Sequence, residues 1–62
     1  MNGKDVIAKL EAAGWTLRRI SGSHHVMKKN GMPSVPVPVH GKRDLPTGVV
    51  CAIARQTGVK LK

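Results

Sequence analysis

Aromatic residues, acidic residues and cysteines are all scarce in this chain. Its 62 residues include one Trp, Trp15, and no Tyr or Phe, so the core has to come from Val, Ile, Leu, Ala and Met. We expect Trp15 to anchor that core. The single cysteine, Cys51, excludes an internal disulfide, and its apolar surroundings predict a small core residue in a reducing cytoplasm. So short a chain predicts one domain over residues 1–62, built from two packed layers.

The chain also has no long hydrophobic run. Its N-terminus lacks the apolar segment of a signal peptide, and no later stretch is long enough to cross a bilayer. We therefore expect a cytoplasmic protein that does not bind a membrane.

Acidic residues number only three, against eleven Lys and Arg, which gives a formal net charge of +8. Residues 15–43 contain no acid at all. An acid-free basic zone is the electrostatic footprint of a phosphate-binding surface, although a basic surface that only keeps a small protein soluble is the alternative. The candidates for phosphate contacts are Arg18, Arg19, Lys28, Lys42 and Arg43.

The periodicity predicts five elements. Helical spacing and a capping box from Asn2 to Asp5 indicate a helix over residues 3–13, and a second helix is expected from Pro46 to Gly58. Strands are expected over residues 15–20, 24–28 and 34–39, with a short tail after residue 58 that we expect to fray. Pro36 and Pro38 remove backbone donors from one side only, so the third strand belongs at a sheet edge. The fold class is therefore α+β, αβββα, with both helices on one face of a three-stranded antiparallel sheet.

The turn at Gly22-Ser23, followed by His24 and His25, is the candidate site. RNA cleavage needs no external nucleophile, because the 2′-hydroxyl attacks its own phosphate once a general base takes its proton. A neutral imidazole fits that role, with Gly22 and Ser23 close to the phosphate. Adjacent histidines in a strand point to opposite faces, and the alternation does not show which is buried. His24 and His25 are therefore both candidates for the base.

Several motifs carry a resemblance to a known family, and the order αβββα is that of the double-stranded-RNA-binding domain. The motifs are Lys4-Asp5-Val6-Ile7, Gly14-Trp15, Gly22-Ser23-His24-His25, Val35-Pro36-Val37-Pro38, Lys42-Arg43-Asp44-Leu45-Pro46-Thr47-Gly48 and Gln56-Thr57-Gly58. With these motifs the chain resembles HicA, a family of small bacterial mRNA interferases that are the toxins of HicAB toxin–antitoxin systems. The resemblance implies an endoribonuclease that inhibits translation and growth, with catalysis resting on His24. It also implies a cognate antitoxin, HicB, that masks the site.

Metals and cofactors are not expected. The three acids, Asp5, Glu11 and Asp44, fall on different elements, whereas a two-metal nuclease needs clustered carboxylates. The expected partners are RNA and an acidic HicB-like protein. His40 is a candidate proton donor to the leaving oxygen. The main alternative is a non-catalytic RNA-binding module, and a DNA-binding repressor is disfavoured because no helix-turn-helix is evident.

Overall fold

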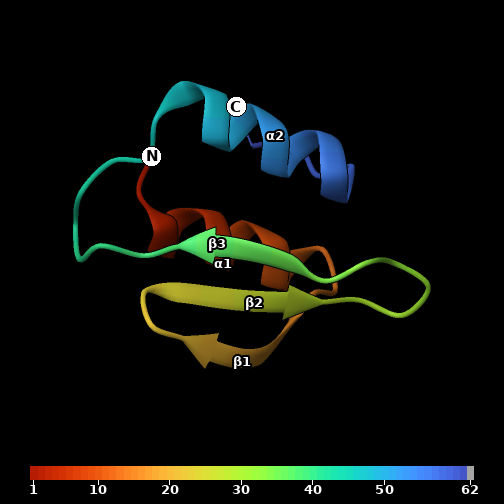
Figure 1. Cartoon of the computed structure of the whole chain (residues 1–62). Coiled ribbons are helices and arrows are strands. Elements are labelled where there is room, and N and C mark those ends of the chain that lie inside the picture. Colours follow the sequence, from red (N-terminus) through yellow and green to blue (C-terminus); the bar gives the residue numbers. More distant parts are fainter. Residues whose placement is uncertain (62) are drawn as a thin grey trace.

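The computed structural model describes residues 1–61 and shows an α+β fold with the order helix, three strands, helix (Figure 1). The strands form one antiparallel sheet in the order β1-β2-β3. This confirms the predicted αβββα fold class. The elements are α1 (Gly3–Ala12), β1 (Thr16–Ser21), β2 (His24–Lys28), β3 (Val35–Pro38) and α2 (Thr47–Thr57).

The ends of both helices follow from the residues that flank them. At the start of α1, the Asn2 side chain accepts a hydrogen bond from the Asp5 amide at 2.9 Å, and the Asp5 carboxylate accepts one from the Asn2 amide at 3.3 Å. The predicted capping box is therefore confirmed. Pro46 lies one position earlier than expected: it is the N-cap of α2, and not a residue of its first turn. Gly58 ends α2 in the left-handed conformation, with φ +73°.

The sheet has two edges that differ in sequence. The strand order makes β3 an edge, as its prolines predicted. Val35 and Val37 of β3 are buried, while Pro36 is exposed. The other edge is β1, whose register against β2 shifts between Leu17 and Arg19. A bulge of this kind increases the local twist of a strand.

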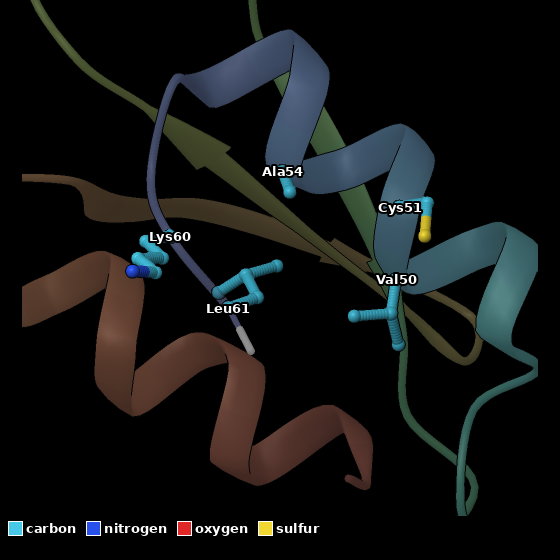
Figure 2. Close-up of a pocket in the computed structure, with 5 residues that line it drawn as sticks. All are labelled: Val50, Cys51, Ala54, Lys60 and Leu61. Carbon is cyan, nitrogen blue, oxygen red and sulfur yellow. The ribbon is translucent and has the colours of Figure 1, made fainter.

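The core lies between the helices and the sheet face that carries Met27, Val35 and Val37. Trp15 is buried, as predicted. Cys51 is only half-buried, so the prediction of a core cysteine is wrong: it lines an apolar pocket of about 190 Å³ between α2 and the C-terminal segment (Figure 2). The buried hydrophobic residues are Val6, Leu10, Trp15, Met27, Val35, Val37, Leu45, Val50, Ile53 and Leu61.

The C-terminal segment packs against this core. We expected it to fray, but only 2 % of Leu61 is exposed, and the residue lies between α2 and α1 (Figure 2). Its side chain adds to a core that has no Phe or Tyr. The free energy gained by burying Leu61 outweighs the conformational entropy that a frayed segment would keep. Four residues that alternate apolar and charged side chains do not show this in the sequence.

Candidate functional site

The turn at Gly22-Ser23 joins β1 to β2 by two residues, so that Ser21 pairs directly with His24. Gly22 has φ +58°, and no residue other than glycine has a positive φ in residues 1–61. A positive φ at the first central position alone is the pattern of a type II′ turn, which two-residue hairpins favour because its twist matches that of the strands. Gly22 therefore sets the conformation that places His24 as the first residue of β2.

The two histidines lie on opposite faces of the sheet. His24 is exposed and shares with Val26 the face that the helices leave uncovered. His25 is half-buried and shares the helix-facing side with the buried Met27. The Nδ1 atom of His25 is buried and makes no hydrogen bond within the described residues. The register thus turns His24 toward solvent and His25 toward the core, a choice that the sequence left open.

Two further residues flank His24 on the neighbouring strands. Ser21 lies opposite His24 on β1, and Pro38 lies opposite it on β3. Sequence reasoning missed both. A two-residue turn, once recognised, identifies Ser21 as the partner of His24. No such signal identifies Pro38, because the connection from Lys28 to Val35 is too long to fix the register of β3.

The connection that leaves β3 comes to the same end of the sheet (Figure 1). The Val39 amide donates a hydrogen bond to the Ser23 carbonyl at 2.7 Å, which ties the start of this loop to the turn. The loop then closes on itself, because the Arg43 amide donates to the His40 carbonyl at 3.1 Å. His40, Lys42 and Arg43 are all exposed. The structure therefore brings two predicted basic residues and a third histidine to the end of the sheet where His24 lies.

The basic residues of the strands are spread along the sheet. Arg19 lies opposite Val26, on the same face as His24, and Arg18 is the extra residue of the bulge. Lys28 ends β2 about 13 Å from His24, four residues at roughly 3.3 Å each. Its ammonium group donates a hydrogen bond to the Met32 carbonyl and so braces the loop after β2. An ammonium has three donors, so Lys28 can still contact a phosphate.

None of the three acidic residues lies on a strand of the sheet: Asp5 and Glu11 belong to α1, and Asp44 precedes α2. Asp5 takes part in the capping box of α1, and the Asp44 carboxylate lies 3.3 Å from the N-terminal ammonium. Within residues 1–61, no three His, Cys, Asp or Glu side chains gather closely enough to hold a metal ion. The same residues include no helix with the length and apolar character that crossing a bilayer requires. The uncovered sheet face thus carries the exposed Arg19 and the half-buried Lys28, and the strands contribute no carboxylate to neutralise them.

Comparison with known proteins gives one family. The family model described as the HicA toxin of bacterial toxin-antitoxin systems matches residues 3–59, nearly the whole chain. A search of curated proteins found no match. The matched residues contain the Gly22-Ser23 turn, both histidines and all five basic candidates.

Proposed function

This chain belongs to the HicA toxin family of toxin–antitoxin systems, and from that premise we propose that it is an mRNA interferase, an endoribonuclease that inhibits translation and growth. The observation that supports the proposal best is the exposed His24 side chain. It projects from a glycine-dependent turn on an uncovered sheet face that carries Arg19 and no acid. An accessible imidazole beside unpaired cations suits a phosphodiester substrate.

In the proposed reaction, the His24 imidazole takes the proton of a ribose 2′-hydroxyl. The 2′-oxygen attacks the adjacent phosphorus, and the bond to the 5′-oxygen of the next nucleotide breaks. The products are a 2′,3′-cyclic phosphate and a 5′-hydroxyl, and no metal is needed to balance the reaction. General-base assistance of this kind accelerates a reaction by about 10²- to 10⁴-fold.

Two other groups at this end of the sheet have proposed roles. The leaving 5′-oxygen takes its proton from His40, which lies at the same end of the sheet, or from water. The proposed role of the Ser23 hydroxyl and the backbone amides of the turn is to stabilise negative charge that develops on the phosphate. Ser23 is half-buried and its carbonyl is held by the Val39 amide, so the turn is ordered before the substrate binds.

Basic side chains hold the RNA backbone on both sides of His24. Arg18 and Arg19 lie along β1, Lys42 and Arg43 lie in the loop after β3, and Lys28 holds a more distant phosphate. Trp15, the one aromatic residue, is buried and cannot stack on an unpaired base. We therefore propose binding through phosphates with weak sequence selection.

The toxin–antitoxin family implies an antitoxin partner. We propose that it is an acidic, HicB-like protein that covers the surface around His24. Association between oppositely charged proteins is fast and slows as salt screens the attraction. A salt-independent association rate would contradict this part of the proposal.

Purified protein and its His24→Ala variant, incubated with a long single-stranded RNA and excess EDTA, test the proposed function. Wild type should fragment the RNA and leave 2′,3′-cyclic phosphate ends, while the variant binds the RNA and leaves it intact. Cleavage that stops in EDTA and returns with magnesium would contradict the metal-free reaction. Binding by both proteins with fragmentation by neither would favour the non-catalytic RNA-binding module.

A further inference from the structure

Strand β1 is exposed along its whole length. All six of its residues, Thr16–Ser21, are exposed, whereas a strand in a small sheet normally buries one face. Two of them are large and apolar: Leu17 is 45 % exposed and Ile20 is 57 % exposed. These are the two exposed large hydrophobic side chains of the described chain.

The position of the helices explains this exposure. Leu17 pairs with Met27 and Ile20 pairs with His25, so both belong to the helix-facing side of the sheet. Both helices pack mainly against β3, and β1 lies on the far side of β2 from β3 (Figure 1). The apolar face of the sheet therefore extends beyond the helices that cover it, and it ends in a pair of uncovered side chains.

The two edges of the sheet are protected to different degrees. Strand β3 carries Pro36 and Pro38, which remove the donors that an added strand would need. Strand β1 contains no proline and has no neighbour on its outer side within the described chain. Its bulge near Arg18 is the only interruption. An unprotected edge beside exposed aliphatic side chains is suited to the addition of a strand from another protein.

We propose that β1 is the docking edge for an acidic segment of the antitoxin, which adds to the sheet as a fourth strand. Its apolar side chains would cover Leu17 and Ile20, and its carboxylates would pair with Arg18 and Arg19. The identity of the partner rests on the proposed function, but the edge itself does not.

Charge decides between the possible occupants. A second copy of this chain would bring its own arginine pair beside Arg18 and Arg19, with a net charge of +8 on each side. RNA contacts arginines, but it offers no backbone ladder to β1 and no aliphatic cover for Leu17 and Ile20. An acidic polypeptide satisfies the edge, the aliphatic pair and the arginines together.

The added strand also competes with RNA. It neutralises two proposed phosphate contacts on β1, and it reaches the site because β1 ends at Ser21, opposite His24. Docking at the edge therefore weakens RNA binding even if the partner never contacts His24.

The test measures the affinity of the purified cognate antitoxin for wild type and for Leu17→Lys and Ile20→Lys, with Ala8→Lys on the exposed surface of α1 as the matched control. Each β1 variant should lose at least about tenfold in affinity, because the added strand can no longer bury the position, while the control stays within about twofold. Amide hydrogen exchange should slow along β1 in the complex. RNA cleavage by the free variants should stay at the wild-type rate, which separates this proposal from the proposed function.

Four outcomes would overturn the proposal. The first is unchanged affinity for both β1 variants when thermal unfolding shows them folded. The second is fast exchange of the β1 amides in the complex. The third is protection of those amides by RNA and not by the antitoxin, which would assign the edge to RNA. The fourth is a dimer of the free protein that Ile20→Lys dissociates, which would assign it to a second copy. If the wild-type protein does not cleave RNA, only the proposed function is contradicted, because antitoxin affinity and amide exchange measure binding and not cleavage.

Discussion

Gly22→Ala should reduce RNA cleavage far more than the same change at Gly31. Both glycines have a positive φ, +58° and +80°, and a Cβ atom added at either would meet nothing within 4 Å. Both substitutions therefore carry a backbone penalty, of about 1–3 kcal/mol for a non-glycine residue held at positive φ. They differ in position: Gly22 lies next to the proposed site, and Gly31 lies in the loop at the other end of the sheet.

Both variants should therefore lose stability, but only Gly22→Ala should lose much of its cleavage activity. Each kcal/mol of this penalty lowers the Tm of a domain this small by roughly 4–8 °C. Relaxation of the strained turn displaces His24, and a misplacement of about 1 Å costs on the order of 10²-fold in rate. Gly31→Ala should cleave RNA at nearly the wild-type rate.

Thermal unfolding and single-turnover cleavage of a labelled RNA, measured on both variants at a temperature where each is folded, provide the comparison. Equal activity of the two variants would show that the conformation of Gly22 does not position the catalytic group. A large loss in Gly31→Ala alone would place the site at the other end of the sheet.

The remaining predictions concern stability and salt dependence. Gly3→Ala should destabilise by about 1–3 kcal/mol in urea unfolding, because its Cβ would collide with the last carbonyl of β3, whereas Gly48→Ala, which has open space, should not. Leu61→Ala should lower the free energy of unfolding by about 2–5 kcal/mol. A loss below about 0.5 kcal/mol, which is typical of a surface substitution, would show that the C-terminal segment does not pack on the core. Arg43→Ala should reduce the slope of log affinity for RNA against log salt by about 0.7, and Arg55→Ala, on α2, should leave it unchanged.

The architecture was predictable because the local signals agree with one another. The capping residues of α1, the glycine after α2 and the alternating prolines of β3 each act through neighbouring backbone groups. Such effects are readable from a few residues. The edge position of β3 follows in the same way, since Pro36 and Pro38 remove donors from only one side of the strand.

The orientation of the histidines was not predictable from alternation. Val26 and Met27 lie on opposite faces of β2 and are both apolar, so composition does not show which face of the strand is buried. Pairing with β1 through the two-residue turn, and with β3 through Val35 and Val37, decides that His25 faces the core. The bulge in β1 and the burial of Leu61 likewise depend on contacts between distant segments.

Single-turnover cleavage of RNA in EDTA by folded His24→Ala and His25→Ala tests the central claim most directly. If the exposed imidazole is the general base, the cleavage rate of His24→Ala should be about 10²- to 10⁴-fold below that of wild type. The rate of His25→Ala should stay within about tenfold of wild type. Cleavage by His24→Ala at the wild-type rate, or a greater loss in His25→Ala, would contradict it.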